Sequence, residues 1–167
     1  MGNWCSNTFE FIGEHSQFEQ LGILFRAMEI KEKKEEKGQV PDFVKGESGF
    51  MFQICWKEGL LYYQTKWQPN LVVMVKIADY FNVGFIHNYT EPGNSIRGEA
   101  CYKDGLLTNI YLNTIETDGI RYHEEGDYYE LEGFGFDAIE ELLDFLLVRK
   151  KMRLSQVGRD DNSITPR

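Results

Sequence analysis

Apolar and polar residues alternate loosely through residues 4–12, where Phe9 and Phe11 fall on one face. This period of two predicts a half-buried strand. Ser16 then stands three residues before Glu19, a capping-box pattern that satisfies backbone donors at the start of a helix. Apolar residues follow it at helical spacing, and they are Phe18, Leu21, Leu24, Phe25 and Met28. The N-terminal segment is therefore predicted to form a strand and then an amphipathic helix.

The middle of the chain alternates with a period of two again, interrupted by one helical stretch. The turn at Lys57-Glu58-Gly59 and the Asp104-Gly105 pair are typical of β-hairpins. Pro69 suits the first turn of a short helix that ends before Gly84. The predicted elements are a hairpin over 50–67, a helix over 71–81, and strands over 85–90, 96–102 and 106–115.

The C-terminal third gives weaker patterns. Residues 119–122 and 128–131 fit short edge strands within a stretch rich in Asp, Glu, Gly and Tyr. A capping box at Asp137 and Glu140 then opens a final helix with apolar residues to Leu147, and cations follow at its C-terminal end, where they complement the helix dipole. Residues 154–167 are polar and are predicted to be a disordered tail.

The order strand, helix, strand, strand, helix, strand is that of a ferredoxin-like βαββαβ sandwich. We therefore expect an α+β fold with an added antiparallel hairpin and a C-terminal helix. The predicted organisation is a single domain over 1–153, with a core at 1–115 and an extension at 116–153.

Charge narrows the range of partners. The chain carries a formal charge of -9, and residues 1–148 hold 25 acidic and 12 basic residues, a net charge of -13. Such a body repels a phosphate backbone, so nucleic acid is not its expected partner. The three cysteines are too far apart for a paired framework, and no apolar run is long enough for a membrane span, so we expect a cytoplasmic protein.

Three spaced motifs resemble those of a known family. They are Met1-Gly2-Asn3-Trp4-Cys5-Ser6-Asn7, with its strand ending at Gly13, then Thr65-Lys66-Trp67-Gln68-Pro69, and Tyr89-Thr90-Glu91-Pro92-Gly93 closed by Gly98. Residues 1–115 resemble the YubB family, which is carried by plasmids and phages. The resemblance implies a ferredoxin-like fold and a mobile-element origin, and it implies no activity. Residues after 116 carry no such resemblance.

One group of side chains is a candidate binding site, because two predicted central strands bring them toward the same end of the sheet. Its members are Lys66, Trp67, Tyr89, Glu91, Arg97 and Glu99. They could form a small polar pocket. The alternative is structural: Trp67 and Tyr89 cap the core, and Glu91 pairs with Arg97 across a hairpin.

Other chemistry is sparse in the sequence. His15, His87 and His123 have no partners at metal-ligand spacing, and Cys5 and Cys55 fall within strands. We therefore expect no cofactor, no metal and no catalytic residues. Aromatic residues could line the open face of the sheet and stack on RNA, or that face is covered by the last helix or a partner. These aromatic residues are Trp56, Tyr62, Tyr63, Tyr102, Tyr111, Tyr128 and Tyr129.

Three functional hypotheses follow. The first is a non-enzymatic accessory protein of a mobile element that binds another protein through an acidic, aromatic-rich surface, for instance on a host nucleic-acid-binding complex. The second is a small-molecule-binding or catalytic domain using a pocket near Lys66, Trp67 and Glu91. The third is a homodimer that pairs the edge strands of its sheets.

Overall fold

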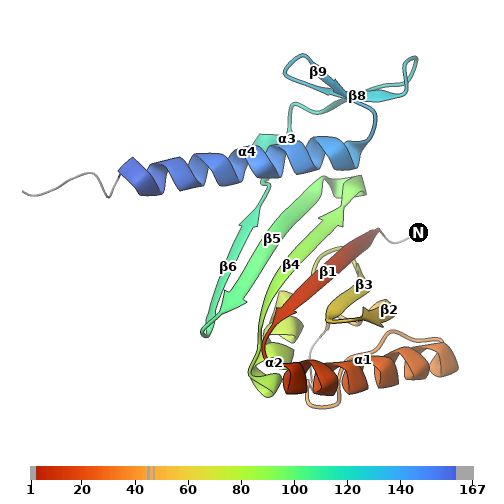
Figure 1. The fold of residues 1–167 in the computed structure, drawn as a ribbon. Coiled ribbons are helices and arrows are strands. Elements are labelled where there is room, and N and C mark those ends of the chain that lie inside the picture. Colours follow the sequence, from red (N-terminus) through yellow and green to blue (C-terminus); the bar gives the residue numbers. More distant parts are fainter. Residues whose placement is uncertain (1–2, 45, 47, 161–167) are drawn as a thin grey trace, which may run out of the picture.

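The computed structural model describes residues 3–44, 46 and 48–160, and Figure 1 shows how their helices and strands are arranged. The first half has the predicted βαββαβ order. Its elements are β1 (Trp4–Ile12), α1 (His15–Glu35), β2 (Phe52–Lys57), β3 (Leu60–Lys66), α2 (Leu71–Phe81) and β4 (Gly84–Glu91).

The main sheet has six strands in the order β2-β3-β1-β4-β5-β6. Strand β1 pairs antiparallel with both β3 and β4, which gives the arrangement of a ferredoxin-like sandwich. The hairpin of β5 (Ile96–Lys103) and β6 (Leu106–Tyr111) extends the sheet beyond β4. The predicted fold class is confirmed, including the added antiparallel hairpin.

Alternate residues of the sheet face α1 and α2. In β1 these inward residues are Cys5, Asn7, Phe9 and Phe11, and all four are buried. Phe9 lies at the centre, where its ring stacks on the rings of Tyr63 and His87. Because burying one large apolar side chain stabilises a fold by about 1.5–3 kcal/mol, this row fixes the register of the central strand.

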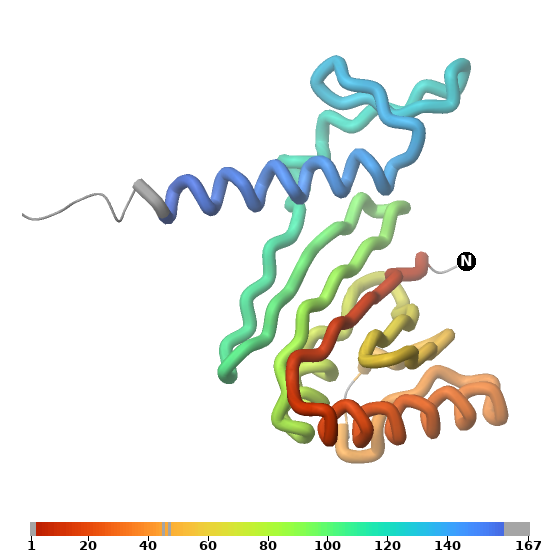
Figure 2. Tube along the Cα trace, viewed as in Figure 1, coloured from red at the N-terminus to blue at the C-terminus, as the bar shows by residue number. Residues whose placement is uncertain are grey.

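The C-terminal extension builds a second, smaller core. It contains α3 (Thr114–Thr117), the three-stranded sheet of β7 (Arg121–His123), β8 (Tyr128–Leu131) and β9 (Phe134–Phe136), and α4 (Ile139–Asp160). Leucines of α4 pack there against Leu112 and Leu131. Figure 2 shows this extension at one end of the main sheet, with α4 crossing above the strands.

Polar contacts fasten α4 to the main sheet. Asp144 of α4 accepts from Arg97 of β5 at 2.6 Å, and Lys151 donates to Glu99 of β5 at 2.7 Å. Lys150 donates to the backbone carbonyl of Tyr111 at 2.5 Å and to Glu116 at 2.9 Å. Helix α4 is thereby held across the ends of β5 and β6.

Two predictions about the C-terminal part were wrong. Helix α4 spans Ile139–Asp160, so residues 154–160 are helical where a disordered tail was predicted, and residues 161–167 lie outside the described part. Strand β9 was not predicted, because its short Phe-Gly-Phe sequence carries no clear alternation. Among the described residues no helix is long and apolar enough to span a membrane.

Of the two alternatives for the aromatic residues, the stacking surface on the open face of the sheet is wrong. Tyr63 and Tyr102 are buried on the helix-covered side of the sheet, and Trp56 stacks there on Phe25. Tyr62 alternates with Tyr63 and therefore lies on the open face. Tyr111 is exposed on β6, and Tyr128 and Tyr129 belong to the small sheet. The seven aromatic residues do not form one stacking surface for bases.

Gly98 offers a test of the packing between β4 and β5. A Cβ at this position would overlap the ring and hydroxyl of Tyr89, which lies across Gly98. We expect Gly98→Ala to lower the free energy of unfolding by roughly 1–3 kcal/mol, measured by urea denaturation.

The matched control is Gly158→Ala, because nothing lies within 4 Å of a Cβ added there in α4. We expect this change to be neutral or slightly stabilising. In a Tyr89→Ala background the overlapping ring is absent, so Gly98→Ala should cost less there than in the wild type. Equal effects of Gly98→Ala and Gly158→Ala would contradict the packing account.

Candidate functional site

The six predicted site residues do lie at one end of the main sheet, but on its two opposite faces. Tyr89 and Glu91 alternate with Thr90 along β4 and are buried on the helix-covered side. Arg97 and Glu99 point to the other face, where α4 binds them. The structure therefore does not bring the six together in one polar pocket.

Glu91 is a structural residue. Its buried carboxylate accepts the backbone N–H of Gly93 at 2.8 Å and of Asn94 at 3.0 Å, and the side-chain amide of Asn94 at 2.6 Å. These bonds cap the short 3-10 turn Pro92–Asn94 between β4 and β5. Glu91 is opposite Ile96 in the hairpin, so the predicted pairing of Glu91 with Arg97 was wrong.

Arg97 and Tyr89 have structural roles as well. Besides its bond to Asp144, the Arg97 guanidinium donates to the carbonyl of Gly98 at 2.7 Å and contacts Asn88. The Tyr89 hydroxyl donates to Asn109 at 2.9 Å, and burial raises its pKa above the ordinary value. Tyr89 thus joins β4 to β6 across Gly98 of β5, and Arg97 joins β5 to β4 and to α4.

Trp67 directly follows β3 and adopts the left-handed backbone region, at a φ of 71°. Its N–H donates to the carbonyl of Asn3 at 2.9 Å, while its indole is half exposed. The preceding residue, Lys66, points its ammonium over the ring of Phe52, 5.5 Å from the centroid. The two side chains do not share the buried positions of Tyr89 and Glu91.

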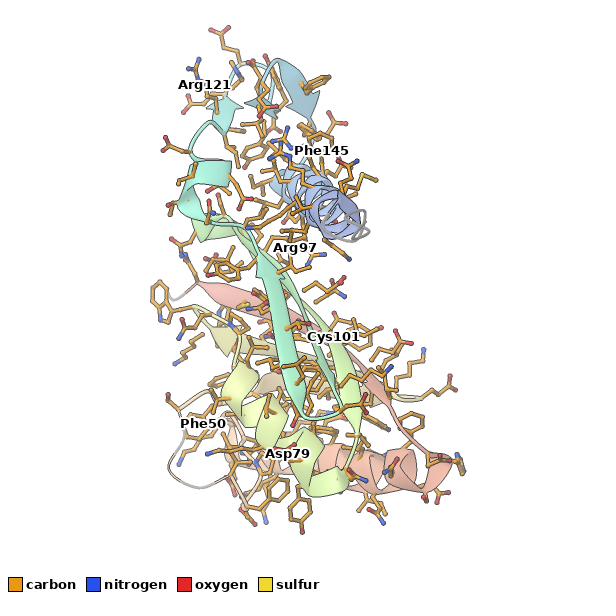
Figure 3. The ribbon with its side chains drawn as sticks, turned by 90° about the vertical axis from the view of Figure 1, so that its left-hand side faces the viewer. Phe50, Asp79, Arg97, Cys101, Arg121 and Phe145 are labelled. Atoms are coloured by element: carbon orange, nitrogen blue, oxygen red, sulfur yellow. The ribbon has the colours of Figure 1, made fainter. Side chains whose placement is uncertain are left out.

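Lys66 lines a cavity of about 560 Å³ between β3, the loop before β2 and the first turn of α2. Figure 3 shows Phe50 beside α2 in this region. The walls are mainly apolar, and among the described residues no carboxylate forms an ion pair with Lys66. The apolar residues that line the cavity are Phe50, Phe52, Pro69, Leu71, Val72 and Val73. Sequence reasoning found Lys66 but missed these residues, because the segment of Phe50 and Phe52 meets the start of α2 only in the folded chain.

A second surface lies on the C-terminal extension. Four aromatic side chains form a row that runs from β7 across β8 and β9 to α4, and they are Tyr122, Tyr129, Phe136 and Phe145. Ring centroids are 4.9 Å apart for Tyr122 and Tyr129 and 5.5 Å apart for Phe136 and Phe145. The two ends of this aromatic row are open to solvent, with Tyr122 49% and Phe145 41% exposed. In Figure 3, Phe145 lies on α4 and Arg121 lies on the small sheet.

Of the three histidines, only His87 is fully buried. Its Nε2 lies 2.9 Å from the Asn7 side-chain oxygen, and the Asn7 amide donates to Thr65 at 3.0 Å. Burial, with a smaller contribution from Arg97, lowers the pKa of His87 to about 3. Among the described residues no group of three or more His, Cys, Asp or Glu side chains could hold a metal ion.

His87 predicts a pH dependence of stability. Because its folded pKa lies below the ordinary value of 6.5, the unfolded chain binds more protons between about pH 6.5 and 3, and stability falls as the pH falls through that window. The slope from this group can reach about 1.4 kcal/mol per pH unit. Urea denaturation at successive pH values should show a smaller slope for His87→Gln, whereas Gln20→Ala, an exposed change in α1 that removes no titratable group, keeps the wild-type slope. An unchanged slope in His87→Gln would contradict this account.

Residues 47–134 match the sequence family described as "Ferredoxin-like domain in Api92-like protein". No curated protein and no solved structure matches the chain. The match includes residues 116–134, so part of the extension, which carries no resemblance to the YubB family, lies within this family's domain. The resemblance to the YubB family itself stays a prediction. Because the matched segment covers more than half of the chain, and the chain has the fold that the description names, the chain belongs to the family of ferredoxin-like domains in Api92-like proteins.

Proposed function

We propose that this chain is a non-enzymatic protein-binding module that uses the acidic, aromatic surface of its C-terminal extension. The observation that carries the proposal is the aromatic row, which is exposed at both ends. Exposed aromatic side chains are enriched at protein interfaces because they bury a large area and lose few rotamers on binding. A partner with an apolar element would cover the exposed ends of the row.

The acidic residues around the aromatic row indicate that the partner carries a positive charge. Residues 116–144 contain eleven acidic residues and one basic residue, Arg121. Three of these acids are neutralised within the chain: Glu116 by Lys150, Glu132 by Arg149 and Asp144 by Arg97. Acids that flank the row, such as Glu124, Glu125 and Glu141, remain exposed. Such a surface attracts a basic partner over a distance and accelerates their encounter at low salt.

Basic surfaces are typical of proteins that bind nucleic acid. We therefore propose a host nucleic-acid-binding protein as the partner class, and a mobile genetic element as the source of the chain. The structural roles of Glu91, Arg97 and Glu99 favour binding over catalysis, because their charged groups are already engaged in bonds within the protein.

The test is recovery of partners by the tagged chain from host lysate at low and high salt. We expect a stoichiometric basic protein that is lost in high salt and recovered at least about tenfold less by Tyr122→Ser or Phe145→Ser, a change of ~1.4 kcal/mol. Tyr62→Ser is the matched control, because Tyr62 is similarly exposed but lies on the main sheet. Equal recovery by all folded variants would contradict the proposal.

The cavity at Lys66 supports a second candidate function, which is binding of a small molecule. Its volume of about 560 Å³ is within the range of ligand sites, and Lys66 is the one cation among the described residues of its mainly apolar walls. A small carboxylic acid with an apolar body complements both features, since its carboxylate can bind the Lys66 ammonium.

Calorimetric titration with octanoate and 3-phenylpropionate tests this second candidate. We expect at least one of the two acids to bind and Lys66→Met to weaken it by about tenfold or more, because the variant keeps an apolar stem but loses the charge. Octylamine is the control ligand and should not bind. If neither acid binds, or if the Lys66→Met variant binds them as well as the wild type does, the candidate is wrong.

A further inference from the structure

The outer edge of β6 is open. This strand ends the order of the main sheet, and no other strand of the described residues pairs with its far side. Its sequence, Leu-Leu-Thr-Asn-Ile-Tyr, contains no charge and no proline, and Leu106 is 67% exposed. Natural sheets usually protect an edge with charges, bulges or a covering element, because a bare edge pairs readily with another strand.

The opposite edge of the sheet is protected in this way. Strand β2 contains an irregularity between Phe52 and Cys55, and Gln53 adopts a φ of 52°. The carboxylate of Glu32 in α1 accepts the N–H of Gln53 at 2.5 Å and of Ile54 at 3.0 Å. The β2 edge therefore has partners for these backbone donors within the chain, and the β6 edge differs from it.

The hydrogen-bond pattern identifies which groups of β6 are available. The N–H of Leu112 donates to the carbonyl of Arg97 in β5. Along an antiparallel strand, residues whose backbone N–H and C=O groups face the paired strand alternate with residues whose groups face away from it. The backbone groups of Leu107, Asn109 and Tyr111 therefore point away from β5. Lys150 already donates to the Tyr111 carbonyl. Leu107 and Asn109 are left as the pairing positions.

Helix α4 reaches past this edge. Figure 1 shows its C-terminal half extending beyond β6. The helix face that buries Leu143 and Leu147 continues at helical spacing to Leu154 and Val157, which are 50% and 62% exposed. We call residues 149–160 the arm. The apolar face of α4 therefore covers the smaller core first and then continues past the open edge of β6. A strand added to β6 would lie on the side toward which the arm extends.

We propose that a second copy of this chain fills that place, with the two β6 strands paired antiparallel around a two-fold axis at Thr108. Leu107 of each copy then pairs with Asn109 of the other, which satisfies the outward backbone groups of both residues. On the open face, Leu106 lies opposite Ile110 of the second copy, and Ile110 belongs to the core beneath that copy's α4. This interface is independent of the aromatic row.

Charge favours a second copy as the occupant. Residues 149–167 carry six basic and two acidic residues, a net charge of +4, whereas residues 1–148 carry -13. The arm of one copy, with Arg153 exposed, therefore lies over a body of opposite sign when the two β6 strands pair. In the dimer each arm covers the exposed Leu106 end of the other copy's β6.

The two-fold axis provides a charge-swap test. Thr108 is exposed and lies opposite itself in the dimer, so Thr108→Lys places two ammonium groups face to face, and Thr108→Glu places two carboxylates. By sedimentation velocity with the full chain, we expect a wild-type dimer and at least a tenfold weaker dimer for each variant alone. An equimolar mixture of the two variants should form a heterodimer. Ser6→Lys, on the open face of β1, is the control and should stay dimeric.

A wild-type chain that is monomeric at 100 µM would overturn the proposal and leave the β6 edge to a strand of a different protein. A dimer that survives both Thr108 variants, or variants whose mixture stays monomeric, would also overturn it. Thermal unfolding of each variant confirms that the substituted chains fold. Partner recovery through the aromatic row is unaffected by either outcome, so the two proposals fail separately.

Discussion

The structure depends on the inward row of β1. Phe9 stacks on His87 with ring centroids 3.8 Å apart and is surrounded by Tyr63 and Phe85 from the two flanking strands. Since a slip of one residue would turn Phe9 and Phe11 to the open face, the register of β1 against β3 and β4 is fixed by this one row. That register in turn fixes the positions of β5 and β6, and these two strands fix where α4 packs.

The same row explains why histidine occurs in the interior. The Asn7 amide bridges His87 and Thr65, so three polar side chains from β1, β3 and β4 are joined beneath the aromatic layer. Thr65 donates onward to the carbonyl of Gln68 at the turn that leads to α2. A buried polar network of this kind tolerates few rearrangements, because each unpaired group would cost free energy away from water.

The main sheet was predictable because apolar and polar residues alternate along its strands and because its turns have clear sequence signals. The alternation around Phe9, the turn at Gly59 and the Asp104-Gly105 pair each have a local physical cause. The extension was harder: β7 and β9 have three residues each, and their pairing depends on packing against α4. The helical arm beyond Leu154 was missed because its polar composition resembles that of a tail, whereas helix propagation from a packed N-terminal half is favourable.

The candidate site shows where sequence reasoning stops. Lys66, Glu91 and Arg97 were correctly placed at one end of the sheet. The face to which each side chain points depends on its place in the alternation along its strand, and for Arg97 also on its bond to Asp144 of α4. Glu91 follows a buried row and precedes a proline turn, and its role as a cap is clear only once the turn geometry is known. The cavity walls at Phe50 and Val72 come from segments whose proximity no local pattern encodes.

The two cores of this chain have a further consequence. Within the described part of the chain, the larger and the smaller cluster share no buried apolar residue. Ile110 of β6 packs on the smaller cluster, and the ion pairs of Arg97 and Glu99 join β5 to α4. Ionic strength weakens such exposed pairs and leaves apolar interiors almost unaffected. Cooperativity between the two units thus depends on the solvent as well as on the sequence, and we expect added salt to weaken their coupling.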